Sequence, residues 1–212
     1  MLEVVPSKDV TCAPYRYQNS GDNLGTITDL GLSEENIEGI LRFLDDHGQR
    51  DDLDSYLNRP FEIKLQFEHK SRFSDGTFPV YYSALELETA QAEIAYQHQR
   101  RVLGRTVPRT VYYREVNCDF RGTVKDLQDY IQQFPFLIVD AQQGGYDQSN
   151  EVAKEAINQG LDGLLTRSAR RHNGTCLPVF RRSALSNSRP GRHVAFSYDP
   201  MTDLVTVSDS AA

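Results

Sequence analysis

The chain has 212 residues, of which 39% are hydrophobic and 25% are charged, with 10 Phe, 11 Tyr and no Trp. This is enough apolar material for a sizeable core, and it excludes a wholly disordered, collagen-like or fibrous protein. Lys and Arg number 23 against 30 Asp and Glu, and the resulting net charge of −7 argues against a general nucleic-acid coat.

No segment of the sequence predicts export or insertion into a membrane. The longest apolar run, 134–139, is far shorter than the ~20 residues that a membrane helix needs, and the first six residues lack the basic and apolar regions of a secretory signal. The cysteines, Cys12, Cys118 and Cys176, are too few and too widely spaced for a disulfide framework or a zinc cage. We therefore expect a cytoplasmic globular protein without a metal site.

The N-terminal third predicts a helix and then a strand. Ser33 is a suitable N-cap, acidic residues follow it, and apolar residues then recur with helical spacing up to Gly48. The polar stretch 45–54 is expected to form a loop or a fraying helix end. Residues 61–67 alternate between apolar and polar, which is typical of a half-buried strand.

The remainder of the chain predicts strands and helices in irregular alternation. A turn at 71–76 leads into a strand at 80–85 and a helix at 89–101 that carries Ala90, Ile94 and Gln97 on one stripe. Later elements are a strand at 111–120, a helix at 124–133, a short buried strand at 136–139, a helix from Ser149 to 158 closed by Gly160, and strands at 164–166, 177–180, 194–198 and 204–207. Without a regular βαβ repeat, this order favours an α+β fold. We expect one domain over 1–212, with its core at about 59–198 and a helical insertion at 20–58.

Four residues are candidates for chemistry from their local context alone. Glu93 lies among small and apolar helix residues, where a carboxylate is paired, functional, or a boundary residue. Arg72 lies in the turn before a strand, where it can clamp a phosphate or be solvated. Tyr82 can stack on an aromatic ring or belong to the core. Ser168 follows a strand, but a Gly-x-Ser-x-Gly motif is absent, so we do not expect a nucleophile.

An arginine-rich stretch near the C-terminus has two interpretations. Between Arg167 and Arg192 the sequence has seven arginines and no acidic residue. Such a cluster can attract phosphates or an acidic partner protein, or it can be a solvated surface.

Two blocks of sequence together resemble the RES-domain family. The first block is Arg72-Phe-Ser-Asp-Gly-Thr-Phe-Pro-Val-Tyr-Tyr-Ser-Ala-Leu-Glu-Leu-Glu-Thr-Ala-Gln-Ala-Glu93, and the second is Gly160-Leu-Asp-Gly-Leu-Leu-Thr-Arg-Ser-Ala-Arg170. The family takes its name from Arg, Glu and Ser in this chain order, which Arg72, Glu93 and Ser168 satisfy. Arg16 and Tyr17 are similar to the opening Arg-Tyr of the family.

The resemblance implies a toxin of a bacterial type II toxin–antitoxin module, with a fold like that of ADP-ribosyltransferase toxins. Such proteins cleave the nicotinamide–ribose bond of NAD+, with phosphate or water as acceptor, so that NAD+ is a substrate and no cofactor is needed. The implied catalytic residues are Arg72, Glu93 and Ser168, and the implied substrate-binding residues are Arg16, Tyr17 and Tyr82. The implied partner is an Xre-like helix-turn-helix antitoxin that occludes the site, in a possible hetero-oligomer.

Two other functions remain open at this point. A protein mono-ADP-ribosyltransferase would use the same NAD+ site with a protein as acceptor. A non-enzymatic module would use the arginine stretch to hold RNA or an acidic partner. The N-terminal residues 1–54, with 12 acidic against 4 basic side chains, argue against extended RNA binding.

Overall fold

The computed structural model of the protein describes residues 2–19, 53–62, 70–104, 106–138 and 145–209, together with Asn36 and Gly39. Within these ranges the strands are β1 (Ser7–Cys12), β2 (Tyr15–Asn19), β3 (Tyr81–Ala84), β4 (Arg109–Asp126), β5 (Gly163–Arg167), β6 (Thr175–Val179), β7 (Leu185–Asp199) and β8 (Leu204–Asp209). The α-helices are α3 (Ser55–Glu62), α4 (Leu87–Val102) and α5 (Asp147–Asn158), and the 3-10 turns are η1 (Leu2–Val4), η3 (Gln128–Tyr130), η4 (Pro135–Leu137) and η6 (Arg182–Ala184).

The strands form one mixed sheet that is built around the long strand β4. The strand order is β2-β3-β6-β5-β4-β7-β8, while β1 pairs with β4 and β2 also pairs with β4. Only the β4–β5 pairing is parallel among these strands. Because β2 pairs with both β3 and β4, it connects the two ends of the run from β3 to β4. Strands β3, β6 and β5 are neighbours in this order. The candidate residues Arg72, Tyr82 and Ser168 lie in these strands or next to them in the sequence.

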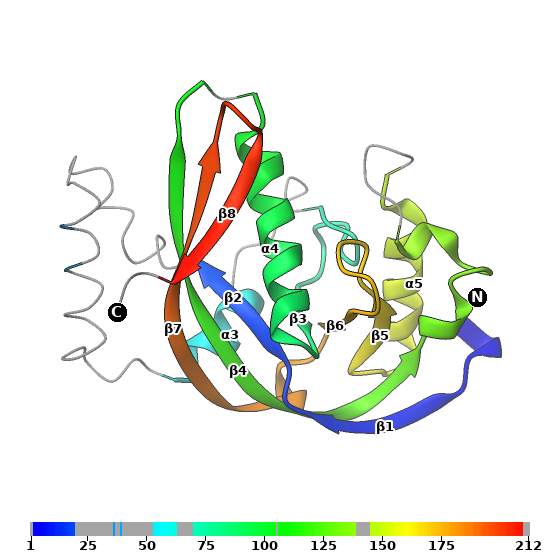
Figure 1. Ribbon diagram of the computed structural model, residues 1–212. Helices are drawn as coiled ribbons and strands as arrows, with labels where there is room; N and C mark the ends of the chain where they lie inside the picture. Colours follow the sequence, from blue (N-terminus) through cyan, green and yellow to red (C-terminus); the bar gives the residue numbers. More distant parts are fainter. Residues whose placement is uncertain are drawn as a thin grey trace.

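Helices lie on both faces of the sheet and define separate parts of the core. Helix α4 contributes Ala90 and Ile94 to a cluster with Tyr17 and Phe196, whereas Leu57 of α3 belongs to a different cluster. A third cluster joins α5 to η1, η3 and η4. Figure 1 shows α4 between the β7–β8 hairpin on one side and α5 on the other. Helix α4 packs on β2, β7 and β8, while α5 packs on β5 and on the turns η1 and η4.

Much of the predicted element order is confirmed, including the mixed α+β class. The expected strands at 80–85 and 164–166 correspond to β3 and β5, and the expected helix at 89–101 corresponds to α4. The predicted stripe on α4 needs one change, because Gln97 is exposed and the neighbouring His98 is the buried residue. The helix that was expected to start at Ser149 begins at Asp147, and Ser149 is buried within its first turn.

The predicted helix at 124–133 is wrong. Residues up to Asp126 continue β4 and pair with β5, and the short turn η3 follows. Asp126 Oδ1 accepts the backbone N–H of Gln128 at 3.0 Å, which starts that turn. The buried ammonium of Lys125 donates to the carbonyl of Leu2 at 2.6 Å. Strand β5 and Leu2 are distant from this segment in the sequence, and their contacts with β4 override the local helical pattern.

The predicted strand at 136–139 is also wrong where the structure describes it. The segment enters η4, with Pro135 in its first turn, and Leu137 is fully buried. A short buried apolar run fits a strand or a helical turn equally well, and a proline at the start favours the turn.

Two further predictions concern parts of the chain that are only partly described. In the strand expected at 61–67, Phe61 and Glu62 are instead the last residues of α3, and residues 63–69 lie outside the described residues. The helix expected after Ser33, and most of the insertion at 20–58, also lie outside them, although Asn36 and Gly39 are helical. The local sequence patterns do not predict β1 or β2.

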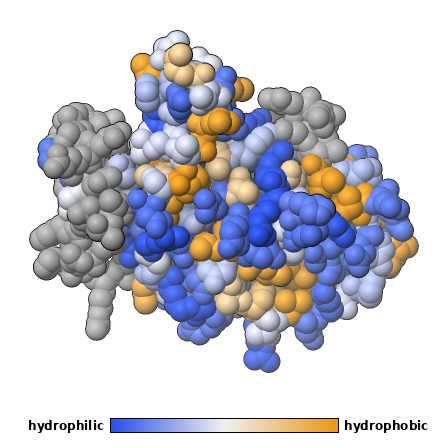
Figure 2. All heavy atoms as spheres, viewed as in Figure 1, coloured by the Kyte–Doolittle hydropathy of each residue, from blue (hydrophilic) through white to orange (hydrophobic). Residues whose placement is uncertain are grey.

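The described helices include none that is long and apolar enough to cross a membrane. On the face shown in Figure 2, hydrophilic residues predominate and the apolar residues lie in small separate groups.

Candidate active site

The turn that carries Arg72 is closed by its own side chains. The Ser74 hydroxyl donates to the carbonyl of Phe78 at 2.6 Å and accepts the N–H of Gly76 at 3.1 Å. Gly76 has a φ of +91°, a conformation that other residues adopt only with strain. Asp75 accepts both the N–H and the hydroxyl of Thr77, at 2.9 and 2.6 Å. The turn is therefore rigid before it meets any ligand.

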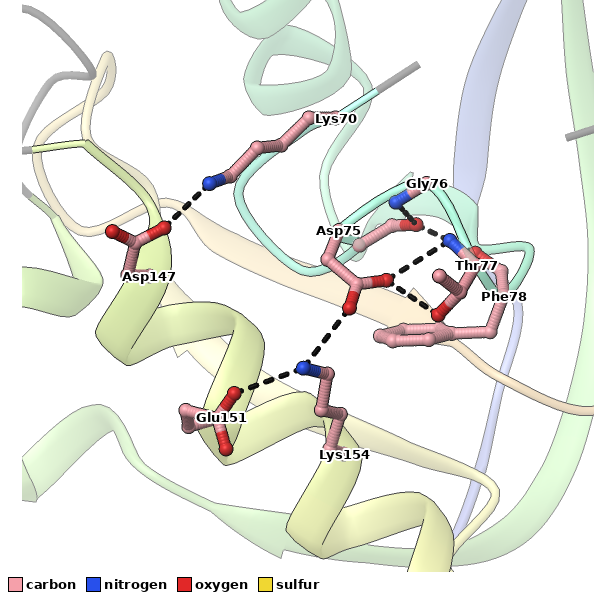
Figure 3. Close-up of polar contacts among 9 residues, drawn as sticks. Lys70, Asp75, Gly76, Thr77, Phe78, Asp147, Glu151 and Lys154 are labelled. Carbon is pink, nitrogen blue, oxygen red and sulfur yellow. Dashed lines mark hydrogen bonds and ion pairs between the residues drawn. The ribbon is translucent and has the colours of Figure 1, made fainter. Parts of the chain in front are cut away.

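Two ion pairs fasten this turn to helix α5 (Figure 3). Lys154 lies 2.9 Å from Asp75, and Lys70 lies 2.5 Å from Asp147 at the start of the helix. The hydrogen bonds from Thr77, and then that from Lys154, lower the pKa of Asp75 to about 2. Asp75 is thus ionised at neutral pH and holds both the turn and α5.

Tyr82 supports the same turn from β3. Its hydroxyl accepts the N–H of Phe73 at 3.0 Å and lies 2.8 Å from the hydroxyl of Ser71. Although 39% of the residue is exposed, the hydroxyl end is enclosed by the turn, and this burial raises its pKa to about 12. Tyr81 is fully buried on the other face, as expected for neighbouring residues of a strand.

The guanidinium of Arg72 lies against an aromatic ring and keeps donors available. Its Cζ is 5.8 Å from the centre of the Tyr146 ring. Its Nε is buried and makes no hydrogen bond to a described residue. A buried guanidinium N–H without a protein partner is costly, so an anionic ligand at this position would be stabilised.

Glu93 and Ser168 are in direct contact, although 75 positions separate them in the sequence. The Ser168 hydroxyl donates to Oε1 of Glu93 at 2.6 Å. Glu93 is half-buried on α4, and Oε2 receives no hydrogen bond from a described residue. One carboxylate oxygen is thus held by the protein while the second is open to a ligand.

Ser168 also organises the β5–β6 loop (residues 168–174). Its Oγ accepts the backbone N–H groups of Arg170 and Arg171, each at 3.0 Å. Because its single hydroxyl hydrogen is given to Glu93 and two N–H groups occupy its oxygen, Ser168 is a poor nucleophile. Its geometry suits orientation of the carboxylate.

The start of α4 is fixed against the same loop and β6. Glu86 Oε2 accepts the Thr89 hydroxyl at 2.6 Å and the backbone N–H of Thr175 at 2.9 Å. Gly174 approaches so closely that a Cβ atom there would lie 2.5 Å from the Thr89 hydroxyl oxygen. The close approach holds the first two turns of α4, and hence Glu93, at a defined distance from the loop.

Cys176 on β6 completes the surroundings of Glu93 and was not singled out from the sequence. Its thiol donates weakly to Oε1 of Glu93, with an S–O distance of 3.6 Å. Burial, and then the negative charge of Glu93, raise the thiol pKa, while the positive charge of Arg72 partly opposes this shift. The thiol is therefore protonated at neutral pH and unsuited to nucleophilic attack. A lone cysteine in a strand gives no signal from which this position could be inferred.

Arg16 and Tyr17 lie on opposite faces of the sheet. The guanidinium of Arg16 lies 4.5 Å from the ring centre of Tyr81, on the face opposite to α4. Tyr17 packs edge-on against Phe196, at 5.6 Å between ring centres, in the cluster beneath α4. Burial, and then the charge of Glu115, raise the pKa of Tyr17 to about 12. The structure therefore does not place Arg16 on the side of the sheet that carries Glu93.

The described residues contain no group of three or more His, Cys, Asp or Glu side chains that could hold a metal ion. They bring together the carboxylate of Glu93, the hydroxyl of Ser168 and the thiol of Cys176. Arg72 and Tyr82 lie on the adjoining turn and on β3.

Comparison with known proteins identifies a family and similar solved structures. The family model described as RES domain matches residues 49–199, a range that contains Arg72, Glu93 and Ser168. No curated protein matches the chain. A solved structure similar to the chain is that of the M. tuberculosis MbcT–MbcA toxin–antitoxin complex, with 13% sequence identity, coverage of 87% of this chain and 86% of that chain, and a TM-score of 0.48.

Proposed function

The chain belongs to the RES-domain family, and on this premise we propose that it is the toxin of a bacterial type II toxin–antitoxin module that degrades NAD+. The bond that breaks joins nicotinamide to ribose, and phosphate or water is the acceptor. The observation that supports this most strongly is the 2.6 Å hydrogen bond between Ser168 and Glu93, because it leaves one oxygen of an oriented carboxylate for the substrate.

The chemistry of the proposed reaction suits an oriented carboxylate. When the glycosidic bond breaks, nicotinamide leaves with the bonding electron pair and positive charge develops on the ribose, as in glycoside hydrolysis. Oε2 of Glu93 would accept a ribose hydroxyl and stabilise that charge. An oxygen of phosphate or water then forms the new bond to the ribose carbon, and attack by water releases a proton.

The surrounding residues have distinct roles in this proposal. Arg72, with its buried Nε, would bind a phosphate group. The exposed part of the Tyr82 ring would stack on nicotinamide. Ser168 would position Glu93 and take no covalent part. The assignment of Arg16 and Tyr17 to substrate binding stays a prediction.

The proposed partner is an Xre-like helix-turn-helix antitoxin that covers the site and blocks entry of NAD+. Removal of that partner is then required for activity, so any assay must use the toxin purified without it.

The proposal is tested by following purified protein with labelled NAD+. We expect release of free nicotinamide together with a small ADP-ribose product, and phosphate in the buffer accelerates the reaction if phosphate is the acceptor. Label that appears on protein instead would indicate a mono-ADP-ribosyltransferase. An absence of nicotinamide release with and without phosphate would contradict the enzymatic proposal.

A further inference from the structure

Asn150 on helix α5 is a buried polar side chain without a hydrogen-bond partner. It is 2% exposed, and neither its Oδ1 nor its Nδ2 makes a hydrogen bond to a described residue. Its neighbour Ser149 is also buried, but the Ser149 hydroxyl donates to the carbonyl of Phe136 at 3.3 Å. Burial of an amide with its donor and its acceptor both unpaired destabilises a fold, and an apolar side chain would be more favourable here. Such a conflict with stability is typical of residues that serve a ligand.

The position of Asn150 on α5 directs it toward the turn that the two ion pairs fasten to this helix. Three residues before Asn150, Asp147 pairs with Lys70. Four residues after it, Lys154 pairs with Asp75, and Figure 3 shows both pairs on the side of α5 that faces the turn. Residues with this spacing share one face of a helix, so Asn150 lies between the two ion pairs and faces the same turn.

The start of α5 brings Asn150 and Arg72 beside the same tyrosine. Helical side chains lean toward the N-terminus of their helix, which directs the amide of Asn150 toward the first turn of α5. That turn follows Tyr146, whose carbonyl accepts the N–H of Asn150 at 2.8 Å. The guanidinium of Arg72 lies 5.8 Å from the centre of the Tyr146 ring, and its Nε is likewise buried without a described partner. Two unpartnered polar groups, one from the turn and one from α5, are therefore neighbours of Tyr146.

These side chains adjoin the candidate active site. Burial chiefly raises the pKa of the Tyr82 hydroxyl, and the charges of Arg72 and Tyr146 act on it in opposite directions, so both lie near that hydroxyl. The pKa of the Cys176 thiol, which contacts Glu93, is raised mainly by burial and is also affected by Arg72. Arg72 and Tyr146 are only half-buried, so a ligand can reach this end of α5.

We propose that Asn150 is a ligand-binding residue of this site, and that its amide pairs with a planar group that presents a hydrogen-bond donor beside an acceptor. An asparagine side chain has a carbonyl oxygen and an NH₂ group, so two hydrogen bonds to such a group would give each of them a partner. A fully ionised phosphate offers acceptors only and would leave Oδ1 unpaired.

NAD+ carries a group of this kind at two places. One is the carboxamide of nicotinamide, which is itself a primary amide. The other is the edge of adenine with N6 and N7, which asparagine binds through two hydrogen bonds. The identification of the bound group as part of NAD+ rests on the proposed function.

The test compares the binding of two probes to the purified full chain by ligand-observed NMR. Nicotinamide carries the carboxamide without adenine, and ADP-ribose carries adenine without nicotinamide. The test variant is Asn150→Leu, which has a similar size and no hydrogen-bonding group, and the matched control is Asn158→Leu at an exposed position of the same helix.

The expected result separates binding from stability. Asn150→Leu should melt at the same temperature as wild type or higher, because an unpaired buried amide is removed. It should bind one probe about tenfold or more weakly, because the donor and the acceptor of that probe lose their partners. Asn158→Leu should bind both probes as the wild type does.

The probe that is affected identifies the bound group. Weaker binding of nicotinamide alone assigns Asn150 to the carboxamide, and weaker binding of ADP-ribose alone assigns it to adenine. Unchanged binding of both probes, weakening of both, or no binding of either by the wild type overturns the proposal. If Asn150→Leu unfolds, Asn150→Ala removes the same amide without added bulk and is judged by the same outcomes. Nicotinamide release from NAD+ by the wild type is measured separately, so failure of this inference is distinguishable from failure of the proposed function.

Discussion

One hydroxyl sets the orientation of the candidate carboxylate. Ser168 gives its hydrogen to Glu93 and receives two backbone N–H groups of its own loop, so the loop and the carboxylate move together. The sequence identified both residues through the order of two motifs. Their contact could not be predicted, because it depends on how β5 and α4 pack across 75 positions of chain.

Removing the Ser168 hydroxyl tests its positioning role. Ser168→Ala leaves two N–H groups and Glu93 Oε1 without that partner, which costs about 1–3 kcal/mol of stability. Because Glu93 loses its orientation, we expect kcat to fall about ten- to a hundredfold while KM for NAD+ changes little. Steady-state kinetics and thermal melting measure both effects, with Ser208→Ala on the exposed side of β8 as the control. A raised KM with normal kcat would instead mean that the hydroxyl contacts the substrate.

Arg72 is expected to behave differently from Ser168. A guanidinium that binds a phosphate group equally in the ground state and the transition state contributes to KM and little to kcat. Arg72→Ala should therefore raise KM for NAD+ or for phosphate by about tenfold or more, with kcat within a few-fold of wild type. The matched control is Arg121→Ala, which removes an exposed arginine of β4. A large fall in kcat with unchanged KM contradicts this role.

At the scale of elements, the Arg72 turn and α5 behave as one unit. The glycine and the polar residues of segment 71–76 predict the turn. They do not indicate the ion pair between Asp75 and Lys154, because α5 follows 70 or more residues later and nothing local to either segment specifies the pairing.

The acid dependence of stability tests this connection. The pKa of Asp75 is lowered to about 2 in the folded chain, chiefly by its hydrogen bond from Thr77, below the value of about 3.9 for an unfolded aspartate. Its contribution is therefore fully present above about pH 4 and is lost as the pH falls toward 2. We expect Asp75→Asn to melt at a lower temperature than wild type at pH 6, and the difference should shrink between pH 4 and 2. A constant difference across that range contradicts a stabilising role of the ionised Asp75 carboxylate, whose partners are Thr77 and Lys154.

Local pattern is sufficient for some of the elements around the candidate site. Helix α4 and the strands β3 and β5 were predicted because their own residues specify them. The local pattern at the end of β4 predicts a helix, whereas its strand character comes from pairing with β5 and from the contact of Lys125 with the carbonyl of Leu2. Such contacts have no counterpart in local sequence.

At the scale of the whole molecule, the pairing of β2 with both β3 and β4 closes the run β3-β6-β5-β4 and brings distant motifs to one region. The family motifs predicted which residues matter, but not that Arg16 and Tyr17, adjacent in β2, point to opposite faces around Tyr81 and Phe196. Neighbouring residues of a strand point to opposite faces of the sheet, so the positions of Arg16 and Tyr17 follow once β2 is known. The local sequence pattern does not predict β2.

Expression in a bacterial host tests the proposed toxin at this scale. Without its antitoxin the chain should arrest growth while cellular NAD+ falls, and co-expression of a helix-turn-helix partner that covers the site should restore both. Cellular NAD+ measured alongside growth separates the possibilities. Growth arrest at constant NAD+ would indicate modification of a protein target instead.

The most direct test of the account is the turnover number of Glu93→Gln in nicotinamide release from NAD+. Glutamine keeps the size of the side chain and an oxygen for the Ser168 hydrogen bond, so the melting temperature should stay close to that of wild type. Loss of the negative charge removes one electrostatic partner of the transition state, and kcat should fall about 10²–10³-fold, or about 3–4 kcal/mol. Glu3→Gln, the same change at an exposed position of η1, should keep normal activity. A folded Glu93→Gln protein with kcat within a few-fold of wild type would remove Glu93 from the reaction and contradict the mechanism.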